Sequence, residues 1–152
     1  MASKETMLAN EIRRKVNMLT EESIEMANGE HTLFNHVGLT DTQLISRAKR
    51  IGHEASSFTS KEAVLACVRD YFNDDYAMSK IIKWIMDSAT PCRSDINEGC
   101  LFDEIIGKVA LPDGTITESS TYSLILQKED KYYRNRITGL PFDIVTAYVV
   151  EE

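Results

Sequence analysis

The sequence has few of the residues that mark disulfide-rich, collagen-like or disordered chains. Among 152 residues there are 3 cysteines, 3 prolines and 7 glycines, whereas 43% of the residues are hydrophobic. An odd number of cysteines without a CxxC pair predicts free thiols and no structural metal. No apolar run is long enough to span a membrane, and the N-terminus lacks the layout of a signal peptide. We therefore expect a globular domain with a proper core and no stable membrane association.

Positive charge is also scarce. The chain has 17 lysines and arginines against 24 aspartates and glutamates, and its formal net charge is −7. This balance disfavours non-specific binding of nucleic acid, because neutralising phosphates requires clustered lysine and arginine. A local basic patch can still exist on an acidic domain. Composition alone therefore leaves two classes open, an enzyme acting on a phosphate-containing substrate and an acidic protein-binding module.

The N-terminal quarter has the apolar spacing of a helix. Four apolar residues recur three or four positions apart, with charges between them: Leu8, Ile12, Val16 and Leu19. This spacing predicts one helix over residues 4–27, which ends before Gly29. We expect residues 1–28 to form a helical segment laid against the main domain of residues 29–152.

Three further helices are predicted from residues that cap helix starts. The predicted starts are Thr40 paired with Gln43, Thr59 paired with Glu62, and the cluster Asn73–Asp75. Gly52 suits the end of the first of these helices. Their predicted buried residues are Leu44, Ile45, Ala48 and Ile51; Ala63, Val64, Cys67, Val68 and Tyr71; and Met78, Ile81, Ile82, Ile85 and Met86. Trp84 lies off the last stripe, a position more typical of packing than of binding.

The C-terminal half changes to segments typical of strands. We expect Ala55–Phe58 and Ser88–Glu98 to be connections, and Pro112-Asp113-Gly114 to form a turn. The predicted strand segments are Leu101–Leu111, Thr115–Thr117, Tyr122–Gln127, Tyr132–Thr138 and Phe142–Val150. Helices followed by strands that are joined by short turns predict an α+β fold with an antiparallel sheet.

Two histidines precede the first capped helix, in a segment that is not itself predicted to be helical. They are His31 and His36, and the helix that follows carries Arg47, Lys49 and Arg50. A ring that titrates near neutral pH beside fixed positive charge suits acid–base chemistry on a phosphate. A lone histidine in a loop is more often an ordinary surface or core residue, and basic residues late in a helix complement its dipole.

The last predicted strand carries two hydroxyl side chains. Because side chains alternate along a strand, one face is expected to hold Phe142, Ile144, Thr146, Tyr148 and Val150. Thr146 and Tyr148 would then present two hydroxyls side by side, both able to donate hydrogen bonds to phosphate oxygens. Threonine and tyrosine are also favoured in any strand, so the pair becomes informative only together with the histidine segment.

The ordered set of these motifs resembles a known family. The pattern GxHTLxxHVGxTDxxLxxR is followed by Ala-Ser-Ser-Phe-Thr, a tryptophan-bearing helix, an Ile-Ile-Gly strand and Val-Thr-Ala-Tyr. Together they resemble the bacterial RNase A-like toxin domain found at the C-terminus of contact-dependent growth inhibition (CdiA-type) effectors. The resemblance spans Gly29 to Val150. The chain departs from the pattern at Gly29-Glu30, where the family usually has two glycines, and in its acidic charge, which Arg134 and Arg136 partly offset.

The resemblance implies a ribonuclease with an RNase A-like fold that lacks that fold's usual disulfides and needs no cofactor or metal. The family's catalytic histidine falls on His36, its arginine on Arg47, and its Thr-x-Tyr pair on Thr146 and Tyr148. His31 is also typical of the family, as a possible second acid or base. The resemblance further implies a cognate immunity protein as a partner, and secretion or surface display within a larger effector that acts in the cytoplasm of target bacteria.

The implied reaction is attack of the RNA 2′-hydroxyl on the adjacent phosphate. His36 would transfer a proton, Arg47 would stabilise the phosphorane, and Thr146 and Tyr148 would orient the phosphate. Either Tyr148 or His31 would take the second proton-transfer role. Three aromatic residues could stack a base: Phe34, Tyr132 and Tyr133. Two alternatives remain, a non-catalytic acidic module such as an immunity or adaptor protein, and a metal-dependent nuclease, for which the sequence lacks a tight carboxylate–histidine cluster.

Overall fold

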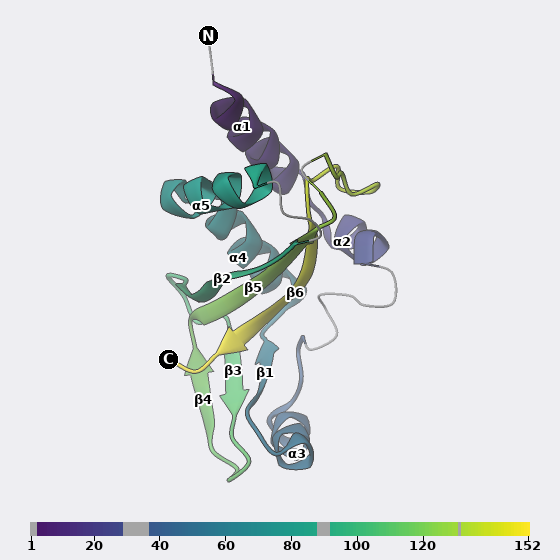
Figure 1. The fold of residues 1–152 in the computed structure, drawn as a ribbon. Coiled ribbons are helices and arrows are strands. Elements are labelled where there is room, and N and C mark those ends of the chain that lie inside the picture. The colour runs from purple at the N-terminus through teal and green to yellow at the C-terminus, as the bar shows by residue number, and fades with distance from the viewer. Residues whose placement is uncertain (1–2, 29–36, 88–91, 131) are drawn as a thin grey trace.

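The computed structural model describes residues 3–28, 37–87, 92–130 and 132–152 (Figure 1). The described parts form an α+β fold of helices and antiparallel sheets, as the order of the sequence patterns predicts. Cys67 and Cys100 are free thiols. The elements are α1 (Lys4–Asn17), α2 (Glu21–Asn28), α3 (Asp41–Ile51), β1 (Ala55–Phe58), α4 (Lys61–Asn73), α5 (Asp75–Met86), β2 (Cys92–Leu101), β3 (Gly107–Ala110), β4 (Ile116–Ser119), β5 (Thr121–Lys128) and β6 (Asp143–Val150).

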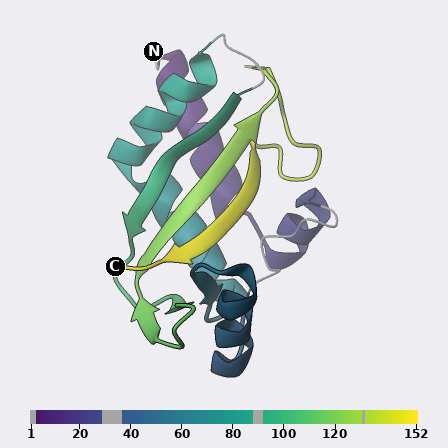
Figure 2. The same cartoon turned by 60° about the horizontal axis from the view of Figure 1, so that its bottom comes forward.

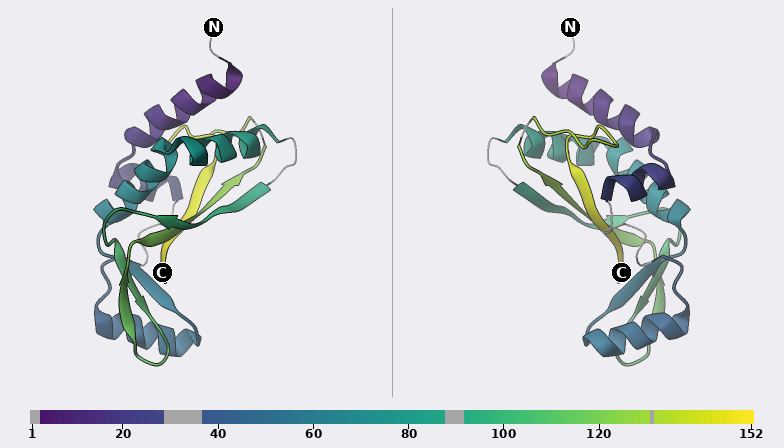
Figure 3. Two further views of the ribbon diagram at one scale, coloured as in Figure 1. Left: turned by 90° about the vertical axis from the view of Figure 1, so that its left-hand side faces the viewer. Right: turned by 90° about the vertical axis from the view of Figure 1, so that its right-hand side faces the viewer.

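The strands form two sheets rather than the single sheet expected from the sequence. The larger sheet has the order β2-β5-β6, and the smaller one has the order β1-β3-β4. Helices α1, α4 and α5 cover one face of the larger sheet, whereas α3 lies on the smaller sheet at the other end of the molecule (Figures 1 and 2). The side views in Figure 3 show these two units joined near the C-terminal end of β6.

The buried apolar residues form a main core, which includes Phe58 of β1 and Val109 of β3, and a separate smaller core. The main core lies between the helices and the larger sheet, and Phe142 is fully buried in it, stacked on Phe72 at 5.2 Å between ring centroids. Trp84 packs sideways against the same Phe142 ring, as its position off the apolar stripe predicts. A smaller core joins Leu44 and Ala48 of α3 to Ala55 and Ala110 of the smaller sheet. Burial of apolar area therefore fixes α3 against β1 and β3.

Several local predictions are confirmed. Thr40 accepts a hydrogen bond from the Gln43 backbone N–H, and the Gln43 side chain accepts one from the Thr40 N–H, which completes the capping box. Gly52 ends α3 in the left-handed region at φ 78°. The Pro112-Asp113-Gly114 turn forms as expected, with Asp113 Oδ1 accepting from the Thr115 N–H at 2.8 Å.

The N-terminal segment is two helices, not one. The chain leaves the helical path between Asn17 and Glu21, because Thr20 and Ser23 hydrogen-bond to each other's backbone N–H groups and start a new helix. Ile12 of α1 and Ile24 of α2 are both buried in the main core. The apolar spacing across the break remains periodic, and that periodicity concealed the capping pair.

Other predictions about local structure were wrong. Two segments predicted to be connections contain strands. Ala55–Phe58 is β1, and Cys92–Leu101, which overlaps the predicted connection Ser88–Glu98, is β2. Both are hydrogen-bonded to neighbouring strands. Residues 132–138 are an irregular loop rather than a strand. Ser60, not Thr59, caps α4 by accepting from the Ala63 N–H at 3.1 Å. Met86 is 43% exposed at the end of α5 instead of lying in the core.

Gly107 allows the two units to approach closely. A Cβ atom at this position would overlap the Ser57 carbonyl oxygen of β1 and would lie 2.7 Å from Val149 Cγ2 of β6. Glycine is the residue that permits such an approach of backbone to backbone. The contact joins β3 of the smaller sheet to β1 and β6, so it positions the two units relative to each other.

We predict that Gly107→Ala destabilises the fold by about 1–3 kcal/mol, because the added methyl group has to displace backbone atoms. Urea unfolding followed by circular dichroism measures this loss. Thr117→Ala, at an exposed position of the same sheet, serves as the control and is expected to change stability by less than about 0.5 kcal/mol. Equal unfolding midpoints for Gly107→Ala and the wild type would contradict the close packing described above.

Candidate functional site

Strand β6 contains a bulge that decides which of its side chains face outward. Along the β5–β6 pair, Leu126 lies opposite Ile144 and Ile125 lies opposite Thr146, so Val145 is an extra residue in β6. An extra residue of this kind shifts the alternation of side chains by one position. Ile144 therefore belongs to the buried face together with Ala147 and Val149, and the expected grouping of Ile144 with Thr146 was wrong.

Three polar side chains of β6 share the outer face. Their cross-strand partners are Gln127 for Asp143, Ile125 for Thr146 and Ser123 for Tyr148, and directly opposite residues point to the same side of a sheet. Tyr148 is 36% exposed and Thr146 is partly exposed. The two hydroxyl-bearing residues thus lie on one face as predicted, pointing away from α1, α4 and α5.

Arg47 lies on a flank of α3 rather than at its centre. Leu44 and Ala48 face the smaller sheet, and Arg47 is partly exposed. On the opposite flank, Asp41 forms an ion pair with Lys108 of β3 at 2.9 Å. Because about 3.6 residues make one helical turn, Asp41 and Arg47 fall on the two sides of the buried stripe. Arg47 therefore lies on the flank of α3 away from Lys108. One edge of the smaller sheet is formed by β1.

The chain immediately before α3 is held against that edge. Val37 forms a parallel bridge with Phe58, the Gly38 N–H donates to the Phe58 carbonyl at 2.8 Å, and the Leu39 N–H donates to Ser57 Oγ at 3.0 Å. These contacts fix the residues that follow the histidine segment. Three predicted residues, His31, Phe34 and His36, lie outside the described residues.

The elements that carry Arg47, Thr146 and Tyr148 are linked through β1. Strand β1, which holds Val37 and packs under α3, also contacts β6. Within the described ranges, no hydrogen bond or ion pair connects Arg47 with Thr146 or Tyr148. A pocket of about 190 Å³ lies beside this junction, between residues 38–39, the end of β1 and Lys108.

A second feature of the outer face was missed by the sequence analysis. Asp143 Oδ1 accepts hydrogen bonds from the Tyr133 hydroxyl at 2.5 Å and from Asn135 Nδ2 at 2.8 Å. Burial and the bond to Asp143 raise the pKa of Tyr133 to about 12, so this hydroxyl remains a donor at neutral pH. Tyr132, the other proposed stacking residue in this loop, is 78% exposed. The loop was predicted to be a strand, and that error concealed the cluster.

Another pocket lies on the helix side of the larger sheet. It has a volume of about 490 Å³ and is formed by α4, α5 and the end of β2. Burial raises the pKa of the Asp70 carboxyl, against the effect of a 3.4 Å hydrogen bond from the Tyr122 hydroxyl. The pocket is on the opposite side of the sheet from Thr146 and Tyr148. It is therefore separate from the candidate site.

Neither a metal site nor a membrane-spanning helix is found in the described part of the chain. Among residues 3–28, 37–87, 92–130 and 132–152, no three histidine, cysteine, aspartate or glutamate side chains are grouped so as to hold a metal ion. No helix in the same ranges is both long and apolar enough to cross a bilayer.

Comparison with known proteins supports the resemblance seen in the sequence. Residues 30–148 match the family described as the bacterial CdiA-CT RNAse A domain. The fold is similar to a chain in the crystal structure of a CdiA-CT/CdiI complex from Y. kristensenii 33638, with a TM-score of 0.58 and 20% sequence identity. That similarity covers 78% of this chain and 97% of the other. No curated protein sequence matches significantly. Since the family match covers more than half of its length, the chain belongs to the bacterial CdiA-CT RNase A domain family of ribonuclease toxins.

Proposed function

We propose that the protein is an endoribonuclease toxin that cuts RNA without a metal ion. The observation that carries this proposal is the bulge in β6, which turns both Thr146 and Tyr148 to the outer face. Strand β6 contacts β1, and β1 holds Val37, the residue next to His36. Family membership supports the ribonuclease chemistry and disfavours the non-catalytic module. The substrate is RNA, with tRNA as one candidate.

The proposed reaction uses the 2′-hydroxyl of the RNA as the nucleophile. His36 accepts or donates the proton in one step, because an imidazole has a pKa close to neutral pH. Arg47 stabilises the charge that develops on the phosphorane, and hydroxyl donors on a rigid strand fix the phosphate oxygens. The products are a 2′,3′-cyclic phosphate and a 5′-hydroxyl. No step in this scheme requires a metal-bound water.

The second proton-transfer group is either Tyr148 or His31. Tyr148 lies on the same face of β6 as Thr146, two residues away, so one strand presents both hydroxyls to a single phosphate. A hydroxyl that points to solvent at this position can exchange a proton with the leaving oxygen. We assign this role to Tyr148 and keep His31 as the competing candidate.

The biological setting follows from the family and from the complex that resembles this fold. We propose that the domain is delivered by a larger secreted or surface effector and acts in the cytoplasm of a target bacterium. The Y. kristensenii structure is a complex of CdiA-CT with CdiI. By analogy, a cognate immunity protein binds this domain and blocks cleavage in the producing cell.

We predict that His36→Ala abolishes RNA cleavage while the fold remains intact. Loss of a general acid or base lowers the rate by about 10²–10⁴-fold. The assay uses total RNA and tRNA in excess chelator, with the cyclic phosphate detected at the new 3′ end. Wild-type cleavage that stops in chelator would overturn the metal-independent mechanism, and an active His36→Ala variant would overturn the assignment of His36.

Arg47→Ala is expected to lower kcat/KM by about 10²–10³-fold. This is the typical loss when one donor that stabilises transition-state charge is removed. Arg50→Ala is the matched control, since Arg50 is an exposed arginine near the end of the same helix. Both variants lose one positive charge from α3. Equal losses in the two variants would show that only the net charge of the helix matters.

Tyr148→Phe removes one hydroxyl and leaves the ring, and we expect kcat to fall by about 10²-fold or more. Tyr76→Phe, at a 70% exposed tyrosine of α5, is the control and should leave kcat unchanged. If His31→Ala reduces kcat as expected for a proton-transfer group and Tyr148→Phe does not, the second acid–base role belongs to His31.

A further inference from the structure

A pocket on the outer face is separate from the residues assigned to catalysis. It has a volume of about 360 Å³ and lies between α2 and the loop of residues 132–142, with Asp143 at one side. Met26 and Ile137, both largely exposed, give it apolar surface, and Arg136 gives it positive charge. Pockets of this size, with apolar walls and a few polar groups, are typical of small-ligand sites.

The pocket lies in line with the proposed catalytic residues. Asp143 precedes the bulge of β6, and its partner Gln127 places it on the same face as Thr146 and Tyr148. Three residues of strand span about 10 Å, a separation that one nucleotide unit can bridge. A phosphate held at Thr146 would therefore bring a neighbouring base within reach of Asp143.

Asp143 is held so that one of its oxygens is available. Both described hydrogen bonds, from Tyr133 and Asn135, go to Oδ1, and within the described ranges Oδ2 accepts none. Asn135 is fixed in turn, because its own Oδ1 accepts from the Ile137 and Thr138 backbone N–H groups at 2.9 and 3.0 Å. The carboxylate is therefore oriented before any ligand binds.

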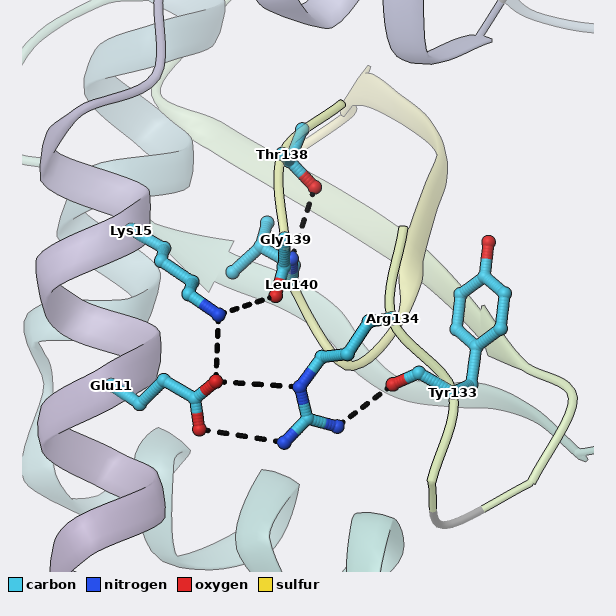
Figure 4. Close-up of polar contacts among 7 residues, drawn as sticks. All are labelled: Glu11, Lys15, Tyr133, Arg134, Thr138, Gly139 and Leu140. Atoms are coloured by element: carbon cyan, nitrogen blue, oxygen red, sulfur yellow. Dashed lines mark hydrogen bonds and ion pairs between the residues drawn. The ribbon is translucent and has the colours of Figure 1, made fainter. Parts of the chain in front are cut away.

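The loop that forms this pocket is tied to α1. Figure 4 shows Glu11 receiving hydrogen bonds from Arg134 and Lys15, while Lys15 Nζ also donates to the Gly139 carbonyl at 2.7 Å. Partial burial alone would raise the pKa of Glu11, but the bond from Lys15 and the charge of Arg134 keep that pKa below its usual value. Glu11 is thus ionised at neutral pH and holds both cations. A preorganised wall of this kind suits selective binding.

We infer that this pocket binds a guanine base next to the phosphate that is cut, with Asp143 as the residue that determines base preference. This inference depends on the proposed ribonuclease function. Guanine has two adjacent donors, N1–H and the N2 amine, and the open Oδ2 has two lone pairs that can accept from both, whereas uracil has acceptors on both sides of a single N–H. Arg136 offsets the negative charge of Asp143 near the RNA backbone, and it has no hydrogen bond or ion pair within the described ranges.

The test begins with the wild-type protein. Cleavage positions in total RNA and tRNA are mapped from their cyclic phosphate ends, and guanosine is expected at one of the two positions that flank the cut. The best substrate is then synthesised with inosine in place of that guanosine, which removes only the N2 amine. We expect kcat/KM to fall by about ten- to a hundredfold, the usual range for the loss of one hydrogen bond to a charged group. Equal cleavage of the two RNAs, or cutting without base preference, would overturn the inference.

Asp143→Asn provides the matching change in the protein. It preserves the shape of the side chain, so cutting at other sequences should continue while the preference for guanosine over inosine disappears. Glu129→Gln, an exposed carboxylate directly after β5, is the control and should keep the preference. A preference that survives Asp143→Asn would overturn the role of Asp143. Absence of any His36-dependent cleavage would instead overturn the ribonuclease proposal itself, and with it the inference.

Discussion

The close approach of β6 to β1 and β3 at Gly107 is the constraint on which the rest of the structure depends. The smaller sheet carries α3 with Arg47 and holds Val37 at its edge, whereas the larger sheet carries Thr146 and Tyr148. Phe58 of β1 and Val109 of β3 also belong to the main core, so apolar packing joins the two units. The contact of Gly107 with Ser57 and Val149 lets their backbones approach closely enough for that packing. A site built from both units therefore requires a residue without a side chain at this point.

The bulge at Val145 is the second constraint, and it reconciles two demands on one strand. Ile144 has to enter the core opposite Leu126, and Val149 has to enter it near the junction with Gly107. The two residues are an odd number of positions apart, and strict alternation would send such a pair to opposite faces. The extra residue restores both to the core. It also leaves Asp143 outward on one side of the bulge and Thr146 and Tyr148 outward on the other.

The sequence predicted best the features that depend on nearby residues. The capping box of Thr40 and Gln43 involves groups three positions apart, so a local pattern is sufficient to find it. Strand β2 is rich in polar residues, and it is a strand because it pairs with β5, which no local pattern reveals. The loop of residues 132–138 has aromatic and β-branched residues typical of a strand, yet Asn135 binds its own neighbours and prevents pairing. The bulge depends on the demands of the core, so no local pattern showed that Asp143 shares the outer face with Thr146 and Tyr148.

The acidic charge of the domain has a structural counterpart that bears on how it can recognise RNA. Many of its cations already form ion pairs within the fold: Arg13 with Asp75, Lys15 and Arg134 with Glu11, Lys61 with Glu25, and Lys108 with Asp41. Lys128 is buried, and its ammonium group donates to the carbonyls of Ile85 and Asp87 at the end of α5. Cations engaged in this way contribute less to binding phosphates, and the affinity for RNA is weaker when fewer phosphates are neutralised. Selection among RNAs then has to come from oriented groups rather than from net charge. The groups proposed for this role, Arg47, Thr146, Tyr148 and Asp143, are each placed by secondary structure that packs on the core.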